Sequence, residues 1–445
     1  MLARLCCLDL DTFFVSVERI LDPSLVGKPV VVGGRPGSRG VVTAASYEVR
    51  ERGVRSGMPL SRAVALAPHA IFLPTRHDTY GGYSQKVWKI VEKYCPTIQV
   101  ASIDELYMDF RGCERLYRRS EDVDDDRTIE RVVRELTATI QSELGLPASV
   151  GIARSKIVAK IASGLAKPAG VLFVPEGNEA QLLSPLPVRK YPGIGPAAEE
   201  RLAAAGIVTL GQILTASEAK LKMIFGSRVA SIQRGIRGES EGKIDAAAPA
   251  FRERDVEVTG VGSISNERTF REDVDDPQSI DAMLCSLAER VCWRARARGL
   301  KARTISLKFR YGDFQTCSRS RTLEPTDSES VVLDVVRSLL ADSWTRTRPL
   351  RLVGVGISKF DANRQIDLFS DTTEFHRAVD SVRDRFGFES LRLASTAETG
   401  KKYSTSVPPD RENEDGPAPR ENTKTRADRP GRRPRGPGSK RRDAR

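Results

Sequence analysis

Residues 101–110, ASIDELYMDF, place two adjacent carboxylates, Asp104 and Glu105, inside an otherwise apolar pattern. The pattern predicts a buried strand pair, and carboxylates in such a setting need a compensating charge. An acidic dipeptide in a chain with 29% charged residues can equally be a solvated turn. Solvated turns rarely lie within runs of Leu, Ile, Met, Phe and Tyr, so the sequence favours a functional site here.

A second acidic stretch lies near the start of the chain. Residues 5–14, LCCLDLDTFF, form another apolar run, which carries Asp9 and Asp11 on one face of a predicted strand. The two stretches can meet only within one folded sheet. A few carboxylates offer the hard oxygen ligands that Mg²⁺ prefers, with room for water and substrate phosphates. Two such ions about 3.5–4 Å apart clamp the attacking and leaving oxygens of an in-line phosphoryl transfer.

The composition bounds the class of protein. At 445 residues the chain has room for about three or four domains. No apolar run approaches the length of a bilayer span, and the N-terminus carries acids and no small-residue cleavage site, so we expect a cytoplasmic protein without a membrane segment. The seven cysteines show no CxxC spacing and there are three histidines, so we expect reduced thiols and no zinc site.

The net charge of +12 is concentrated at the C-terminus. Residues 401–445 contain 14 Lys or Arg against 7 Asp or Glu, with many Pro and Gly and almost no apolar residues. Such a segment cannot bury enough surface to fold, so residues 391–445 are predicted to be a disordered basic tail. The tail is either simply solvated or holds nearby DNA loosely by counterion release.

Two further segments imitate ligand-binding motifs. Residues 29–42, PVVVGGRPGSRGVV, are rich in glycine, but no GK[ST] follows them, which favours a strand–loop–strand hairpin over a phosphate loop. Residues 121–127, EDVDDDR, are acidic, but their spacing matches no calcium loop, and we expect a solvated loop.

Five motifs occur in an order and spacing that resemble those of the Y-family DNA polymerases, with the DNA polymerase IV (DinB-type) branch nearest. They are DLDTFFVSVE at 9–18, SYEVRERGVRSGMP at 46–59, SIDELYMD at 102–109, GIARSKIVAKIASGLAKPAG at 151–170 and PGIGP at 192–196. The likeness extends to about residue 390. Departures are small: Leu106 stands where that family more often has a small residue, and Thr12 occupies a variable position.

The resemblance implies a multidomain α+β protein with the right-hand polymerase fold. The expected divisions are a catalytic palm at 1–12 and 77–167, small fingers at 13–76, a helical thumb with a helix-hairpin-helix at 168–240, a linker at 241–253, an α/β little finger at 254–360, a clamp-binding segment and C-terminal helix at 361–390, and the tail. Within these divisions the patterns predict helices at residues 13–21, 155–165, 280–298 and 328–340.

The resemblance also implies a catalytic site with two Mg²⁺ ions. Asp9 and Asp104, with the backbone carbonyl of Leu10, would hold the ion that binds the triphosphate. Asp9, Asp104 and Glu105 would hold the ion that lowers the pKa of the primer 3′-hydroxyl. Asp11 is the nearby rival, but the first acid of the DxD pattern is the ligand in that family.

Three residues are candidates for binding the triphosphate. Tyr47 and Arg50 are three apart in a helical pattern and so share a face, where arginine suits bidentate binding of phosphate oxygens. Lys167 follows the predicted helix at 155–165, which opens with a Ser155 cap. Lys167 could simply be a favourable cation at a helix C-terminus. The resemblance assigns all three to the phosphates of the incoming nucleotide.

Two neighbouring phenylalanines complete the expected nucleotide site. By the residues alone, Phe13 and Phe14 are both core side chains. The resemblance places both at the nucleotide, and Phe14 matches the steric gate, a ring under the sugar with which a ribose 2′-hydroxyl would collide.

Two regions are expected to grip DNA without reading bases. The turn at 192–196 exposes backbone N–H groups of Gly193 and Gly195 at a helix start, and a second turn at 225–228 could pair with it. Strands at 301–311 and 315–323 alternate basic and apolar residues, which predicts one basic face to lie along a phosphate backbone or to remain solvated. The basic face should carry Arg303, Lys308, Arg310, Arg319 and Arg321.

The segment at 365–369, QIDLF, follows the last expected domain. It resembles the motif that bacterial polymerases insert into a pocket of the sliding clamp, with Gln365 as the anchor and Leu368 and Phe369 as the hydrophobic plug. An ordinary amphipathic turn is the alternative.

The function implied is low-fidelity, DNA-directed DNA synthesis past damaged template bases, without a proofreading exonuclease, by a monomer that binds primer–template DNA and deoxynucleoside triphosphates. Two alternatives remain. A catalytically inactive relative could act as a scaffold, although it should lack the acids. A two-metal nucleotide cyclase also uses acidic palm strands, although it would not need the thumb hairpin or the basic sheet.

Overall fold

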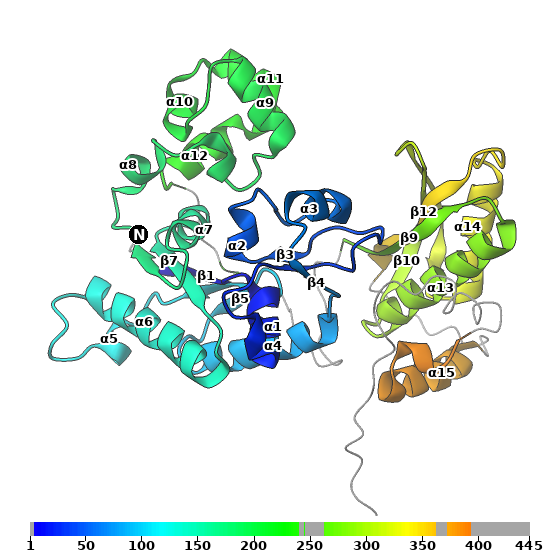
Figure 1. Ribbon diagram of the computed structural model, residues 1–445, viewed down its shortest axis with the longest axis horizontal. Coiled ribbons are helices and arrows are strands. Elements are labelled where there is room, and N and C mark those ends of the chain that lie inside the picture. The colour runs from blue at the N-terminus through cyan, green and yellow to red at the C-terminus, as the bar shows by residue number, and fades with distance from the viewer. Residues whose placement is uncertain (1–3, 240–243, 245–261, 362–371, 393–445) are drawn as a thin grey trace, which may run out of the picture. The chain divides into compact units, whose positions relative to one another are not determined.

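The computed structural model describes residues 4–239, 244, 262–361 and 372–392. Most of the expected linker at 241–253, the segment at 365–369 and the tail from residue 393 onward therefore lie outside the described residues. Figure 1 shows the described helices and strands in chain order. In the described part of the chain, no helix is both long and apolar enough to span a bilayer.

A five-stranded sheet contains both acidic stretches. Its order is β5 (Ile98–Val100), β6 (Glu105–Asp109), β1 (Leu5–Leu10), β7 (Ala148–Ala153) and β8 (Val171–Phe173). The central strand β1 runs antiparallel to both of its neighbours, and β8 is parallel to β7. The acidic stretches thus become adjacent strands, as the sequence predicts.

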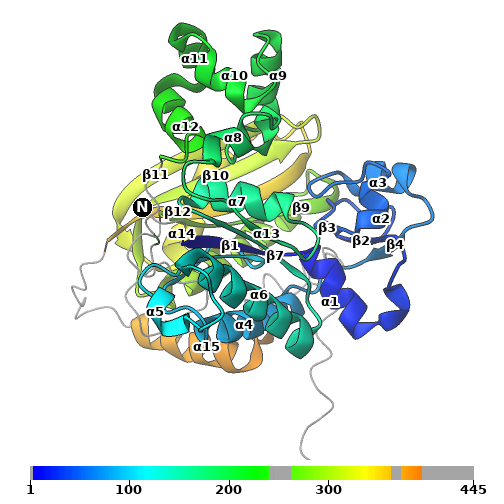
Figure 2. The same ribbon diagram turned by 90° about the vertical axis from the view of Figure 1, so that its left-hand side faces the viewer.

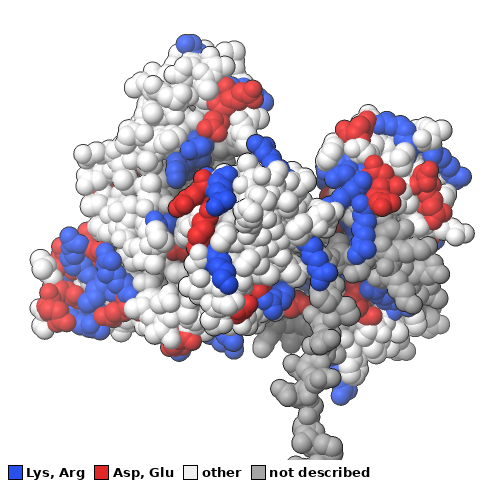
Figure 3. Space-filling view, viewed as in Figure 1, with Lys and Arg blue, Asp and Glu red and all other residues white. Residues whose placement is uncertain are grey.

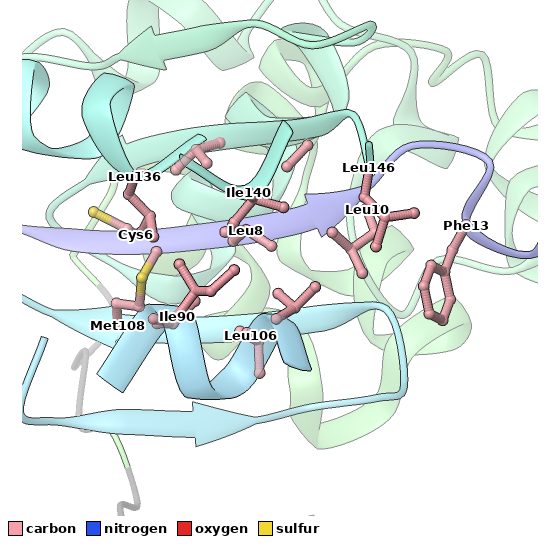
Figure 4. Packing of buried hydrophobic residues seen from close by; sticks show 14 of the residues in the cluster. Cys6, Leu8, Leu10, Phe13, Ile90, Leu106, Met108, Leu136, Ile140 and Leu146 are labelled. Atoms are coloured by element: carbon pink, nitrogen blue, oxygen red, sulfur yellow. The ribbon is translucent and has the colours of Figure 1, made fainter. Parts of the chain in front are cut away.

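Side-chain alternation gives this sheet two different faces. Cys6, Leu8 and Leu10 of β1 point toward Leu106 and Met108 of β6 (Figure 4). Helices α4 (His77–Glu92) and α6 (Asp125–Leu144) cover this face and bury its apolar side chains. Helix α7 (Lys156–Leu165) lies over the other face (Figures 1 and 2). The side chains that alternate with the core of β1 and β6 therefore point toward α7.

The predicted helix boundaries are confirmed within a few residues. Helix α1 spans Phe13–Leu21, and α7 begins after Ser155, whose side chain accepts a hydrogen bond from the amide of Val158. The acidic run at 121–127 is more than a solvated loop. Asp124 caps α6, and Asp122 accepts hydrogen bonds from Arg131.

Helices α5 (Glu114–Tyr117) and α6 carry a network of ion pairs on their exposed side. Arg118 pairs with Asp125 at 2.7 Å, and Arg119 pairs with Glu135 at 2.8 Å. Figure 3 shows such acidic and basic side chains as adjoining groups. This pairing accounts for the acidic run without a bound calcium ion.

The residues between α1 and α4 form a small second sheet with the order β3, β2, β4. Strand β2 (Val30–Val32) pairs antiparallel with β3 (Ala44–Ala45), which confirms the predicted hairpin, and parallel with β4 (Ile71–Leu73), which was not predicted. Two short helices, α2 (Tyr47–Arg50) and α3 (Leu60–Leu66), accompany it.

Short helices follow β8. They are α8 (Glu179–Leu183), α9 (Pro196–Ala204), α10 (Leu210–Thr215), α11 (Glu218–Phe225) and α12 (Val229–Ile236), with 3-10 turns η2 (Val188–Lys190) and η3 (Gly226–Arg228). Their buried residues join those of α7, Cys7 and Ala153 in one hydrophobic cluster. The sequence prediction of a helical region is confirmed.

The last large unit is a four-stranded antiparallel sheet with helices packed on it. The strand order is β11 (Thr316–Thr326), β10 (Lys301–Tyr311), β12 (Leu350–Asp361) and β9 (Ser263–Val274). Helices α13 (Pro277–Arg296) and α14 (Glu329–Ala341) start and end within a few residues of their predicted bounds. The C-terminal helix α15 (Thr372–Phe386) is held to α13 through buried ion pairs, among them Arg383 with Glu289, and the turn η4 (Phe388–Ser390) follows it.

Gly151 of β7 allows α7 to lie directly on the sheet, because a Cβ there would overlap the backbone of Ala159 and Ser163. We expect Gly151→Ala to lower the free energy of unfolding by about 1–3 kcal/mol, since the helix backbone cannot yield. Gly164→Ala is the matched control: on the same helix its Cβ would meet nothing within 4 Å, and alanine favours a helix. Urea unfolding compares the two, and an equal stability for both variants would contradict this packing.

Candidate active site

The structure brings the three predicted metal ligands together at one end of the sheet. Asp9 of β1 lies directly opposite Glu105 of β6 in the strand register. The amide of Leu10 donates a hydrogen bond of 2.9 Å to the backbone carbonyl of Asp104, which lies in the turn before β6. Asp9, Asp104 and Glu105, distant in the sequence, are therefore neighbours.

Two lysines face these acids. Lys160 of α7 contacts Oε2 of Glu105, and Lys167, just beyond α7, contacts Oδ1 of Asp9. Asp104 Oδ1 accepts a hydrogen bond of 2.5 Å from the hydroxyl of Ser102. Each acid thus has its own counter-charge or hydrogen-bond donor.

The electrostatics of Asp9 show a site that is short of positive charge. Burial raises the pKa of Asp9, and the charges of Asp104 and Glu105 raise it further against the opposing effect of Lys167. The contact with Asp9 raises the pKa of Lys167, although burial alone would lower it. A divalent cation between these carboxylates would relieve their repulsion.

The donor set fits Mg²⁺, because carboxylate and carbonyl oxygens are the ligands that a hard cation takes. Among the described residues, no group of three His, Cys, Asp or Glu side chains is close enough together, as placed, to hold a metal ion. In this arrangement Lys167 contacts Asp9 and Lys160 contacts Glu105.

Asp11 has a different task from Asp9. Strand β1 ends at Leu10, so the expectation that Asp9 and Asp11 share one strand face is wrong: Asp11 lies in the turn that follows. It is buried, and its Oδ2 accepts hydrogen bonds from the Ser149 hydroxyl at 2.7 Å and the Ala169 amide at 2.6 Å. Asp11 thereby fixes the loop that presents Lys167.

Tyr47 and Arg50 share a face of α2, as predicted, with the guanidinium 5.4 Å from the centre of the tyrosine ring. The Tyr47 hydroxyl is buried and makes no hydrogen bond within the described residues. Burial raises its pKa, and the charge of Asp11 raises it further, whereas Lys167 lowers it. Buried hydroxyls are almost always satisfied, so this group is suited to an arriving oxygen ligand such as a phosphate.

The two phenylalanines separate in the structure. The ring of Phe13 is buried in the core, so its side chain cannot touch a ligand, and a nucleotide contact there would be through its backbone. Phe14 is half-buried and stacks on Tyr80, with ring centres 4.1 Å apart. The hydroxyl of Tyr80 donates to Glu18 at 2.6 Å, which fixes both rings.

Sequence reasoning missed Lys160 and Tyr80. Lys160 lies within the predicted helix at 155–165 and Lys167 lies beyond it, so no helical spacing joined the two lysines. Tyr80 carried no signal either, because its contact with Phe14 joins two helices distant in sequence.

The two predicted turns of the helical region are neighbours. Gly193 adopts a φ of +92°, and a Cβ there would lie 2.9 Å from the guanidinium of Arg228 in the second turn. Gly195 precedes Pro196, the first residue of α9. A cavity of about 290 Å³ beside the first turn has a largely apolar lining with three basic residues. It is lined by Lys160, Ile161, Gly164, Arg189, Lys190, Tyr191, Pro192, Gly193 and Ile194.

In the four-stranded sheet of β11, β10, β12 and β9, the face away from the helices carries fewer basic residues than the sequence predicts. In β10 the core residues Ile305, Leu307 and Phe309 alternate with Lys308 and Arg310, which therefore lie on the face away from α13 and α14. On this open face the ammonium of Lys308 pairs with the carboxylate of Glu267 at 2.8 Å.

The expectation that all five basic residues share this face is wrong. Arg319 and Arg321 lie opposite core residues of β10, and register partners point to the same side of a sheet. Arg321 accordingly donates to Ser338 of α14 at 3.1 Å. Arg303 is two residues from Ile305 in β10, so its side chain leaves the strand on the same side. Its guanidinium pairs with Asp361 at 2.8 Å. The side of Arg303 follows from alternation within β10 itself. The sides of Arg319 and Arg321 depend on the register of β11 against β10, which alternation within each strand does not reveal.

Comparisons with known proteins agree with this geometry. Residues 8–164 match the impB/mucB/samB family, residues 261–368 its C-terminal domain, and residues 176–207 the IMS family HHH motif. The chain is 35% identical over 401 residues to DNA polymerase IV of Dehalococcoides mccartyi (strain CBDB1), covering 88% of this chain and 97% of the relative. It is 39% identical over 366 residues to DNA polymerase IV of Streptomyces coelicolor, covering 82% and 72%.

Solved structures are similar as well. The Y-family DNA polymerase chimera Dbh-Dpo4(243-245)-Dbh aligns with a TM-score of 0.66 at 25% identity, covering 81% of this chain and 99% of the chimera. An insertion ternary complex of Dbh DNA polymerase aligns with a TM-score of 0.54 at 25% identity, with the same coverage.

Proposed function

Since this chain belongs to the impB/mucB/samB family of Y-family DNA polymerases and is a DNA-directed DNA polymerase, we propose that it copies damaged templates with low fidelity by two-metal nucleotidyl transfer. The observation that carries the mechanism is the direct pairing of Asp9 with Glu105, next to Asp104. Three acids gathered at one end of a largely apolar strand pair are costly to bury, which favours a functional role for them.

The carboxylates are assigned to two Mg²⁺ ions, which together activate the primer 3′-hydroxyl and offset the charge of the triphosphate. Asp9, Asp104 and the carbonyl of Leu10 would hold the nucleotide-side ion. Asp9, Asp104 and Glu105 would hold the primer-side ion. Asp11 is left out of both sets: its Oδ2 accepts hydrogen bonds from Ser149 and Ala169, and its Oδ1 lies 3.4 Å from the ammonium of Lys167.

The basic and aromatic residues around the acids are assigned to the nucleotide. Lys167 would leave Asp9 for a phosphate oxygen, and the unpartnered hydroxyl of Tyr47 and the guanidinium of Arg50 would bind the same phosphates. Phe14, fixed by Tyr80, would lie under the sugar as a steric gate.

We assign the palm to 1–12 and 77–167, the fingers to 13–76, the thumb to 168–240 and the little finger to 254–360. The little finger holds a cluster of buried residues of its own, and the fingers hold a smaller one. The palm cluster also takes in Val15 and Val32 of the fingers, and the thumb cluster takes in Cys7 and the buried residues of α7. The fingers sheet has strands of only two or three residues, so little protein surface would test the shape of a new base pair, which favours low fidelity.

Primer–template DNA would be held through its phosphates. The hairpin at Gly193 and Gly195, the cavity beside it, and Lys308 and Arg310 of the open sheet face provide donors and charge without a pattern for reading base edges. We also propose that the protein works as a cytoplasmic monomer without a proofreading exonuclease.

We propose that the segment at 365–369, outside the described residues, binds the bacterial sliding clamp. Leu368→Ala with Phe369→Ala should weaken binding to the purified clamp by at least about tenfold, because such apolar anchors dominate small interfaces. Surface plasmon resonance measures the affinity, with Asp367→Ala as the matched control. Unchanged affinity in the double variant would remove the clamp from the proposal.

Primer extension tests the proposed function. The full-length chain should extend a primer opposite both undamaged template and an abasic site when Mg²⁺ is present and should stop when EDTA removes it. A scaffold would bind the same DNA without extending it. A cyclase would consume nucleotide without primer. Either of the last two results would contradict the proposal.

A further inference from the structure

The carboxylate of Glu105 is held from two sides. Lys160 of α7 contacts Oε2, and the thiol of Cys7, on the neighbouring strand β1, lies 3.7 Å from Oε1. The Cys7 thiol is fully buried. Lys160 is thus the charged partner of an acid that already has a packed neighbour on its other side.

We propose that Lys160 is a positioning residue, which keeps the Glu105 carboxylate beside Asp9 and limits how tightly the primer-side metal binds. The inference rests on the proposed function, because it concerns the same acids. Lys160 is not among the residues assigned above to the metal ions or to the nucleotide.

The surroundings of Lys160 favour this role over that of a nucleotide ligand. Lys160 lies on the wall of the cavity whose other cations are Arg189 and Lys190. The ammonium of Lys160 is paired with the carboxylate of Glu105. Lys167 can transfer from Asp9 to a triphosphate, whereas Lys160 remains as the fixed counter-charge of the acidic cluster.

Loss of the Lys160 charge has two opposite consequences. A divalent ion near Glu105 no longer faces a neighbouring cation, so its affinity should rise. The carboxylate also loses the contact that fixes its rotamer, so fewer bound ions are aligned for reaction and kcat should fall. A purely structural lysine would lower stability without producing this opposite pair of effects.

The experiment uses the full-length protein with Lys160→Met, a neutral side chain of similar length. Electron paramagnetic resonance of free Mn²⁺ measures metal binding without DNA or nucleotide, and single-nucleotide incorporation measures kcat and the half-saturating Mg²⁺ concentration. We expect Mn²⁺ binding to tighten about threefold to tenfold and kcat to fall about tenfold. Lys160→Arg keeps the charge and should restore the wild-type affinity for Mn²⁺.

Lys156→Met is the matched control, one turn earlier on α7, where the lysine contacts Gln99 and the ring of Tyr107. It should leave metal binding and kcat unchanged. If Lys160→Met does not fold, Lys160→Gln replaces it, with the same expected rise in Mn²⁺ affinity. Unchanged or weaker Mn²⁺ binding in a folded neutral variant would overturn the inference. Failure of the wild-type chain to bind Mn²⁺ or extend a primer would instead overturn the proposed function.

Discussion

Replacing Glu105 with glutamine is expected to slow primer extension about a thousandfold while DNA affinity stays within about twofold. Stabilisation of charge by a metal ion is worth several kcal/mol, and about 1.4 kcal/mol corresponds to a tenfold change in rate. Glutamine keeps the shape of the side chain and its place beside Lys160 but removes the negative charge that a primer-side ion needs. Rapid-quench incorporation of one nucleotide gives the rate, and fluorescence anisotropy gives the DNA affinity.

Asp109→Asn is the matched control for Glu105→Gln. Asp109 lies on the same strand, β6, four residues after Glu105, so the two side chains point to the same face of the sheet. Asp109 is at the other end of the strand, where its carboxylate pairs with Arg111. Its extension rate should stay near wild type. Equal losses of extension and DNA binding in Glu105→Gln would contradict the assigned role, as would equal losses of extension in the two variants.

Replacing Phe14 with valine should raise incorporation of ribonucleotides about a hundredfold relative to deoxyribonucleotides. The ring is half-buried and fixed by Tyr80, so it cannot turn aside for a 2′-hydroxyl, whereas valine leaves the space open. Steady-state incorporation of paired ribo- and deoxyribonucleoside triphosphates measures the ratio.

Phe13→Leu is the contrasting variant. The Phe13 ring is buried in the core, so we expect a loss of stability of about 1 kcal/mol with sugar discrimination unchanged. A change in sugar discrimination in Phe13→Leu, or none in Phe14→Val, would place the gate elsewhere.

The parts of the fold that depend on local chemistry were predictable from the sequence. Caps such as Ser155, and the period of the apolar residues, located the helices within a few residues. The convergence of Asp9 with Asp104 and Glu105 was predictable because two apolar strands carrying acids can only pair, and the motif resemblance supplied their order.

The errors concern features that depend on where a strand ends or how two strands register. Asp11 left the face of Asp9 because β1 ends one residue earlier. Arg319 and Arg321 emerged on the helix side because the pairing of β11 with β10 places them opposite core residues. The counter-charges Lys160 and Lys167 come from α7 and from the loop just after it, which meet the sheet only after folding, so neither contact could be derived from spacing alone.

Anomalous scattering from Mn²⁺ in crystals of the full-length protein with primer–template DNA and a non-hydrolysable deoxynucleotide tests the central claim most directly. The account predicts two peaks about 3.5–4 Å apart, both bordered by Asp9 and Asp104 and one also by Glu105, with Lys167 moved to the triphosphate. A map in which Asp9 keeps its contact with Lys167 while manganese binds away from Asp9, Asp104 and Glu105 would contradict it.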